Sequence, residues 1–211
     1  MDFLRKFLDA LLPPRLTATR ISSTSISELG TFSNPSLMSV NGVDLVWLLP
    51  YRAPLVRSLI LEAKYHEHAT AHALLGSVLA EYLLSLLEET AFDNPRFVLV
   101  PIPLSKRRHR ERGYNQTEGI VREAIKLLPD SFSLDTRLVR RVRDTTPQTR
   151  LGRKARLTNM NGAFSLVSAL DSDCTYIVID DVSTTGATLS ACTDAFRTVG
   201  ADKILLLALA H

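Results

Sequence analysis

The segment TYIVIDDVSTTGAT (175–188) constrains the fold of this chain more than any other, because an almost purely apolar run ends abruptly in acids, hydroxyls and a glycine. The run at 175–180 lacks apolar/polar alternation, which is typical of a strand covered on both faces of a parallel sheet. Residues 186–199 predict a helix directly after the turn. In an open parallel sheet, ligands bind beyond the carboxyl ends of the strands. The segment therefore predicts a sheet and the place of a ligand site.

The rest of the chain alternates between strand-like apolar runs and segments with helical spacing. Further strands are expected at 43–49, 96–103, 137–142, 163–167 and 203–210. Further helices are expected at 3–12, 54–65, 69–88 and 115–128. This alternation predicts an α/β fold in which a mostly parallel open sheet carries helices on both faces.

Residues 17–42 are rich in Ser, Thr, Asn and Pro and show little periodicity, so we expect an irregular connector there. The chain is long enough for one well-cored domain. We therefore divide it into an N-terminal segment at 1–45, made of a helix and the connector, and a domain at 46–211.

The turn after the 175–180 strand combines two kinds of ligand group. Asp180 and Asp181 are acceptors suited to sugar hydroxyls or a divalent cation. Gly186 permits a tight turn, and the helix that follows offers free amides and the positive end of its dipole to a phosphate. The three hydroxyl donors around that glycine are Thr184, Thr185 and Thr188. A phosphorylated sugar satisfies both halves; the alternative is that these residues only cap the helix.

Positive charge is concentrated in two patches. Residues 105–112 hold five Lys/Arg against one Glu, and residues 137–156 hold eight against one Asp. The rest of the chain has net charge −8, although the whole chain is +3. This distribution favours a polyanionic partner, and the alternative is two solvated basic loops.

Several classes of protein are disfavoured. No uncharged apolar run reaches about 18 residues, so no membrane span is expected. Charges interrupt the apolar stretch at 1–15, unlike a signal peptide, so we expect a cytoplasmic protein. The usual nucleotide loops, G-x-x-x-x-G-K-[ST] and G-x-G-x-x-G, are absent. Cys174 and Cys192 are too few for a four-thiolate zinc site. A metal site at His66, His68 and His72 is a weak alternative.

Three blocks of sequence resemble known families. IVIDDVSTTGATL (177–189) closely resembles the phosphoribosyl-pyrophosphate signature of type I phosphoribosyltransferases. PIPLSKRRHRERGYNQ (101–116) resembles the RGxNQ block of the ComF family of competence-associated proteins, which have that fold. RRVRDTTPQTRLGRKARLTNMNGAF (140–164) is similar to that family's block before its final strands and to the flexible catalytic loop of amidophosphoribosyltransferases. Weaker similarity is found at 51–65 and 11–15.

The resemblance implies a Rossmann-like type I phosphoribosyltransferase fold with a small N-terminal hood, and phosphoribosyl pyrophosphate with Mg²⁺ as the ligand. Asp180 and Asp181 would contact the ribose. Mg²⁺ would arrive with the ligand, and the same two acids are its candidate protein ligands. The implied 5′-phosphate loop is Thr184, Thr185, Gly186, Ala187 and Thr188. The implied pyrophosphate-binding residues are Ser105, Lys106, Arg107, Arg108 and Arg112. The implied flexible loop contains Arg143, Gln148, Arg150 and Arg156.

One departure from the ComF pattern concerns zinc. Many ComF-like proteins carry paired cysteines soon after an LLPPR-like segment, and these form a small zinc finger. Residues 16–50 contain no cysteine here, so no zinc is expected.

The resemblance implies transfer of phosphoribose to a nitrogenous acceptor with release of pyrophosphate. An enzyme is favoured because both acids and the basic residues of 105–112 are present. Two alternatives stay open: a regulator that binds phosphoribosyl pyrophosphate or a nucleoside monophosphate without turnover, and an accessory protein of competence and DNA uptake. Nucleic acid is a weaker partner, because Tyr114 is the only aromatic residue in or beside the patches. The acceptor and the oligomeric state are left open, with His66 as one candidate for acceptor contact.

Overall fold

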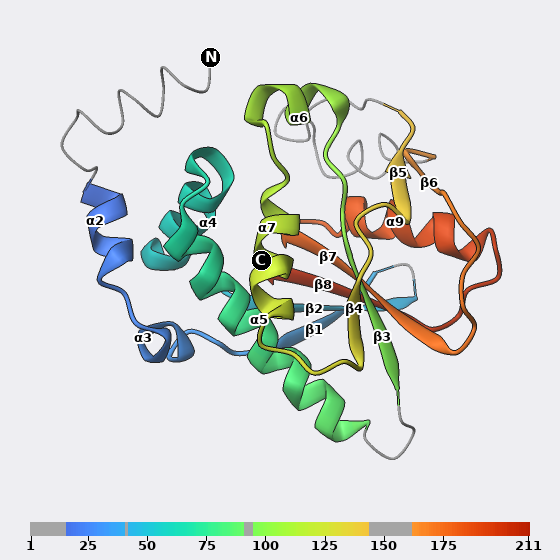
Figure 1. The fold of residues 1–211 in the computed structure, drawn as a ribbon, viewed down its shortest axis with the longest axis horizontal. Helices are drawn as coiled ribbons and strands as arrows, with labels where there is room; N and C mark the ends of the chain where they lie inside the picture. Colours follow the sequence, from blue (N-terminus) through green and yellow to red (C-terminus); the bar gives the residue numbers. More distant parts are fainter. Residues whose placement is uncertain (1–15, 41, 91–94, 144–161) are drawn as a thin grey trace.

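The computed structural model describes residues 16–40, 42–90, 95–143 and 162–211. Its centre is a six-stranded sheet of order β1-β2-β8-β7-β3-β4 (Figure 1). Its strands are β1 (Ser36–Val40), β2 (Val43–Leu49), β3 (Arg96–Pro101), β4 (Phe132–Leu134), β7 (Cys174–Val182) and β8 (Ile204–Ala210). Every neighbouring pair is parallel except β1 and β2. The prediction of an α/β fold with a mostly parallel sheet is confirmed.

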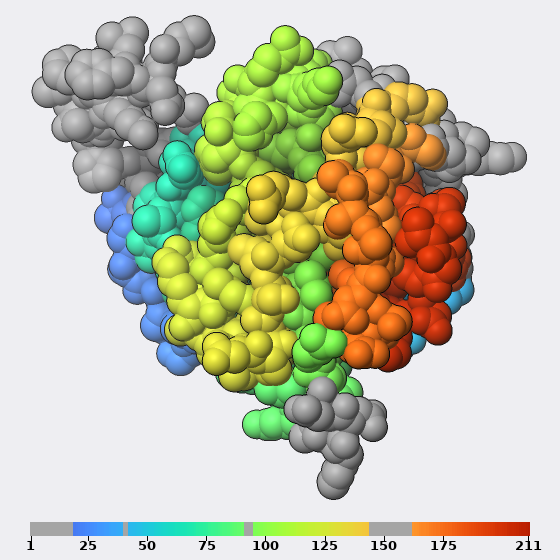
Figure 2. All heavy atoms as spheres, turned by 45° about the vertical axis from the view of Figure 1, so that its right-hand side comes forward, coloured from blue at the N-terminus to red at the C-terminus, as the bar shows by residue number. Residues whose placement is uncertain are grey.

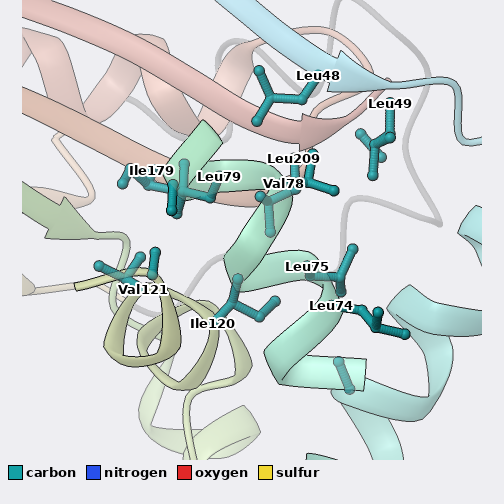
Figure 3. Packing of buried hydrophobic residues seen from close by; sticks show 14 of the residues in the cluster. Leu48, Leu49, Leu74, Leu75, Val78, Leu79, Ile120, Val121, Ile179 and Leu209 are labelled. Carbon is teal, nitrogen blue, oxygen red and sulfur yellow. The ribbon is translucent and has the colours of Figure 1, made fainter. Parts of the chain in front are cut away.

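One face of the sheet is covered by three helices, which Figure 1 shows together on one side. They are α4 (Pro54–His66), α5 (Ala69–Glu89) and α7 (Gln116–Ile125). Leucine and valine side chains of α5 and α7 pack on Ile179 and Leu209 from the central strands, as Figure 3 shows. The apolar spacing of these helices places their buried stripe toward the sheet, as the sequence predicts.

The opposite face is covered by α9 (Ala187–Arg197). Phe196 and Cys192 are fully buried there, against strand residues that include Val178 and Ala208. A separate two-stranded antiparallel ribbon, β5 (Val139–Arg141) and β6 (Phe164–Leu166), joins this second core. Helices on both faces are thus confirmed, and β7 is buried on both faces because α5 and α7 cover one face and α9 covers the other.

The predicted irregular connector at 17–42 is wrong. This stretch forms α2 (Leu16–Ser22), α3 (Ile26–Gly30) and the edge strand β1. Ile21 and Leu29 are fully buried, and Ser25 caps α3 by accepting a hydrogen bond from the Glu28 amide. Two isolated apolar anchors give no period that can be read, so tertiary packing decides the structure of such a stretch.

Two further elements were not expected from the sequence. The first is the short strand β4, whose three residues follow a turn at the edge of the sheet. The second is α6 (Lys106–Arg112), a helix at the first basic patch. The helix predicted at 3–12 lies outside the described residues. The division at residue 45 stays a prediction.

Helix α5 is long and apolar enough to cross a membrane by length and composition alone. Half of its most apolar 18-residue window is buried inside the protein. Because the core helix of a globular domain passes the same test, this is weak support for a membrane span.

Candidate functional site

The two predicted acids lie at the carboxyl end of β7, between the ends of β8 and β3. On one side, Asp180 pairs with Ala208 of β8. On the other side, the chain leaves β3 beside Ile179, and the Ile102 amide donates a 2.9 Å hydrogen bond to the Ile179 carbonyl. Asp180 is half-buried, whereas Asp181 is only 4% exposed. The two carboxyls are close enough for the charge of Asp181 to act on Asp180, but they differ in exposure and in their partners.

Asp181 is held by groups from three elements. Its Oδ2 lies 2.8 Å from Lys64 Nζ of α4 and accepts a 2.8 Å hydrogen bond from Gln116 Nε2 of α7. Its Oδ1 accepts a 2.7 Å hydrogen bond from the Val182 amide. Burial alone would raise the pKa of Asp181, but the Lys64 charge and these hydrogen bonds outweigh it and lower the pKa. Asp181 is therefore a fixed anion.

Asp180 behaves differently. Burial, with the negative charge of Asp181 beside it, raises the pKa of Asp180 to about 7, while Lys64 acts in the opposite direction. Its Oδ1 accepts a 2.9 Å hydrogen bond from the Asp181 amide. Near neutral pH this carboxyl exchanges a proton readily. Asp180 is thus the acid of the pair that is partly open and not tied to a cation by a direct contact in the described residues.

The turn that follows the acids is shaped by short-range hydrogen bonds. Gly186 is the N-cap of α9 and has a φ of 72°, a left-handed conformation that favours glycine. Its amide donates to Ser183 Oγ at 3.1 Å, and the Ala187 amide donates to Thr185 Oγ1 at a long 3.4 Å. A glycine N-cap supplies no side-chain cap, so the positive end of α9 faces the turn without one.

The loop residues differ in exposure. Thr184 is exposed, Thr185 and Thr188 are half-buried, and Gly186 and Ala187 are buried. Helix N-termini with this geometry are ready anion sites. The predicted phosphate loop is therefore placed beside the predicted acids, at one edge of the sheet.

The first basic patch forms a helix, α6, which the sequence analysis did not predict. Ser105 is the N-cap of α6, and its Oγ accepts a 3.3 Å hydrogen bond from the Arg108 amide. Lys106 and Arg107 are exposed, Arg108 is half-buried, and no residue of α6 is buried. A serine followed by strong helix formers explains this helix, since Lys and Arg favour helices. Figure 1 shows α6 beyond the end of β3, and in Figure 2 the same stretch, in yellow-green, projects at the top of the molecule.

Arg112 is half-buried, and its guanidinium contacts two side chains of the protein. Its Nη1 donates to Gln116 Oε1 at 2.8 Å, and its guanidinium lies over the Tyr65 ring, 5.1 Å from the centroid. Arg112 thus contacts the same Gln116 side chain that donates to Asp181. Its role as a pyrophosphate ligand stays a prediction.

The second basic patch is described only in part. Arg143 is exposed, and the Arg141 guanidinium lies 5.5 Å from the Phe164 ring centroid. The other predicted loop residues, Gln148, Arg150 and Arg156, lie outside the described residues.

The three histidines at 66–72 do not converge on a metal. His68 caps α5, with its Nδ1 accepting from the Ala71 amide at 3.4 Å. His72 is buried on α5 beside the Tyr114 ring. Within the described residues, no group of three or more His, Cys, Asp or Glu side chains could hold a metal ion.

Three residues of the site were missed by the sequence reasoning. Lys64 and Gln116 bind Asp181 directly. The Tyr114 hydroxyl donates to the Ala63 carbonyl at 2.8 Å and accepts from the Glu67 amide at 2.7 Å, so it fastens the α6–α7 junction to the end of α4. A lysine among the apolar positions of α4 was the available signal for Lys64, and the RGYNQ block contained Tyr114 and Gln116.

A cavity of about 570 Å³ lies away from these residues, at the amino ends of the strands, lined by residues that include Phe97, Thr175 and Ile204. Ligands of parallel α/β sheets bind at the opposite, carboxyl edge. We therefore assign the candidate site by the placement of its chemical groups and not by cavity size.

Comparison with known proteins finds relatives named for DNA utilization and for competence. The chain is 30% identical over 146 residues to "DNA utilization protein YhgH" of Salmonella typhimurium and to the protein of the same name from Escherichia coli K12. It is 34% identical over 116 residues to "Competence protein F" of Haemophilus influenzae. The chain is related to the ComF family.

These matches cover part of each protein. The YhgH alignments span 69% of this chain and 62% of the relative. The competence protein F alignment spans 54% of this chain and 49% of the relative. No family model matches the chain. The resemblance to ComF noted in the sequence is thus confirmed as a relationship.

Proposed function

We propose that this ComF relative binds phosphoribosyl pyrophosphate and transfers phosphoribose to a nitrogenous acceptor, releasing pyrophosphate. One observation carries the proposal: a half-buried acid, Asp180, lies at the carboxyl end of a central parallel strand, and a short turn leads from it to a glycine-capped helix N-terminus. An acceptor of sugar hydroxyls beside an anion seat suits a sugar phosphate. The basic helix α6 follows the neighbouring strand β3 and supplies cations near the same edge.

Each part of the ligand has candidate partners. Asp180 accepts hydrogen bonds from the ribose hydroxyls, with Asp181 behind it. The amides and hydroxyls of the turn at 184–188 hold the 5′-phosphate. Ser105, Lys106, Arg107 and Arg108, at the start of α6, face the pyrophosphate. Guanidinium groups suit phosphate oxygens because they can donate two parallel hydrogen bonds.

The proposed Mg²⁺ fits this site as a companion of the ligand. The oxygens of Asp181 already accept from Lys64, Gln116 and Val182, which leaves Asp180 as the accessible carboxylate of the pair. Mg²⁺ commonly binds through one or two carboxylates plus substrate phosphates. When bound, the ion would neutralise charge on the departing pyrophosphate.

Catalysis in such a site needs positioning and charge stabilisation. As the bond from the anomeric carbon to pyrophosphate breaks, positive charge develops on the sugar, and the nearby Asp180 carboxylate stabilises it. Cations of α6 stabilise the negative leaving group. Holding the acceptor nitrogen in line with the anomeric carbon supplies the rest of the acceleration.

The proposal is tested by calorimetric titration with phosphoribosyl pyrophosphate and Mg²⁺. We expect Asp180→Asn to weaken binding at least tenfold, and the Asp180→Asn/Asp181→Asn double variant to weaken it further. Asp173→Asn is the matched control, since Asp173 is exposed and lies at the opposite end of β7. Equal affinity in the wild type and the double variant would remove the site assignment.

A sensor without turnover is separated from an enzyme by a second assay. The wild-type protein is incubated with the ligand, Mg²⁺ and a panel of nitrogenous bases, and pyrophosphate release is measured. Tight binding without release across the panel would assign the protein to the regulators.

A second candidate function is the handling of DNA. The names of the relatives refer to DNA utilization and competence. Helix α6 exposes basic side chains suited to phosphate contacts, but Tyr114 is committed to α4 and offers no stacking platform. Single-stranded DNA affinity is measured against salt concentration; a steep fall supports this function, and a weak, flat response removes it.

A further inference from the structure

The charge of Asp181 is balanced from within the chain. Lys64 Nζ lies 2.8 Å from Asp181 Oδ2, and the two side chains are 19% and 6% exposed. An ion pair this well shielded from water is screened far less than a surface pair. The ammonium therefore occupies Oδ2 of this carboxylate, and a divalent cation cannot bind that oxygen in the same place while the pair is intact.

The lysine is presented by a helix end that is itself fastened in place. The Tyr114 hydroxyl donates a hydrogen bond to the carbonyl of Ala63, the residue before Lys64. It accepts one from the amide of Glu67, the C-cap of α4. The neighbouring Tyr65 ring packs under the Arg112 guanidinium, and Arg112 donates to Gln116, which also binds Asp181. These contacts connect the end of α4 to α6 and α7, and through Gln116 to Asp181 of β7.

The consequence concerns the two acids as a pair. With Lys64 in place, one internal positive charge offsets part of the negative charge of Asp180 and Asp181. A free divalent ion that bridges both carboxylates must displace the ammonium and leave Lys64 without its partner, which costs free energy. An ion that arrives on a sugar phosphate needs only the accessible Asp180 and ligand oxygens.

We propose that Lys64 is the resident counter-ion of the acid pair, a positioning residue that keeps free divalent cations off Asp181 and leaves Asp180 to meet a cation already carried by the ligand. The part about the ligand rests on the proposed function. The part about free cations does not, and it is tested without any sugar phosphate.

The experiment measures Mn²⁺ binding by electron paramagnetic resonance of the free ion. We expect Lys64→Met and Lys64→Gln to bind Mn²⁺ at least ten times more tightly than the wild type, because two adjacent carboxylates then lack an internal cation. Lys64→Arg should restore the wild-type affinity. Lys126→Met is the matched charge control, since Lys126 is 63% exposed and pairs with Glu123 on the far part of α7.

Two measurements keep the result decisive. Circular dichroism shows which variants are folded; Lys64→Gln keeps a hydrogen-bond donor and so serves if Lys64→Met unfolds. Adding Asp180→Asn to Lys64→Gln should abolish the gain, which places the ion at the acid pair. A folded Lys64→Gln protein with unchanged Mn²⁺ affinity, or with a gain that Asp180→Asn leaves intact, overturns the proposal. Failure of phosphoribosyl pyrophosphate to bind the wild type would sink the proposed function and leave this result standing.

Discussion

Two charged regions of this protein differ in how their charges are balanced. Around Asp181, the cation, the anion and their hydrogen-bond partners all come from the chain, and they are largely shielded from water. On α6, Lys106, Arg107 and Arg110 are exposed, and the ion pair from Arg107 to Glu111 spans 3.8 Å between half-exposed side chains. The charges of the first region are balanced inside the protein, whereas those of the second face solvent.

The difference teaches where charge stabilises the fold and where it serves binding. Breaking a shielded pair leaves an uncompensated charge, which is strongly destabilising. An exposed pair is screened by solvent and contributes little to stability. Changes at Asp181 should therefore act mainly on unfolding, and changes on α6 mainly on affinity.

The largest effect is expected from Asp181→Ala, which leaves Lys64 without its counter-ion. We expect the free energy of unfolding to fall by about 3 kcal/mol. Urea denaturation measures it, with Glu118→Ala as the control: its 2.7 Å pair with Arg122 is solvent-exposed on the arginine side. The control should change stability by less than about 1 kcal/mol. Similar losses in both variants would break the comparison between shielded and exposed charge.

The first region also depends on the close approach of α5 and α7, because α7 carries Gln116. A Cβ atom on Gly76 would lie 2.6 Å from Glu123 Cβ and 3.0 Å from the Ala124 amide nitrogen. We expect Gly76→Ala to destabilise the protein by about 1–3 kcal/mol through overpacking. Gly30→Ala is the control, since its Cβ would meet nothing within 4 Å. Thermal melts of both variants check this, and an unchanged Gly76→Ala melt would mean that the helices can separate.

His72 sharpens the comparison as a buried group that has no salt-bridge partner among the described residues. Burial lowers the pKa of His72 below its ordinary 6.5, against the opposing charges of Glu67 and Glu123. The unfolded chain then binds the proton more readily, so stability should be full above pH 6.5 and fall as the pH drops below it. Urea titrations at pH 7.5 and about 5.5 should differ by roughly 1 kcal/mol more in the wild type than in His72→Leu. An equal difference in both proteins would assign the loss to other groups.

The sequence predicted the elements with long, regular patterns. The apolar run of β7 and the leucine spacing of α5 each have a period or a length that local sequence defines. It failed for α2 and α3, where single anchors such as Ile21 depend on distant partners. It also gave no helix at 106–112, although Lys and Arg favour helices and α6 forms there.

For the candidate site, the sequence predicted the residues that are adjacent along the chain. It missed the residues that only the fold brings together. Asp180, Asp181 and the turn through Thr188 follow one another along the chain and lie together. Lys64 is more than a hundred residues from Asp181 in sequence, and only the packing of α4 beside the sheet brings its ammonium there. The roles of these residues in binding stay predictions.

The smallest change in stability is expected on α6, where the comparison is sharpest. Replacing Lys106 and Arg107 with Gln removes two exposed charges, so the free energy of unfolding should change by less than about 0.5 kcal/mol. Affinity for pyrophosphate with Mg²⁺ should nevertheless fall severalfold, since the lost cations face the proposed leaving group. Replacing Arg122 and Lys126 with Gln removes the same number of exposed charges from another part of the surface and is the control for net charge. Calorimetry and urea denaturation on the same samples separate the two effects. Unchanged pyrophosphate affinity beside a loss of stability would reverse the assignment and make α6 a structural element.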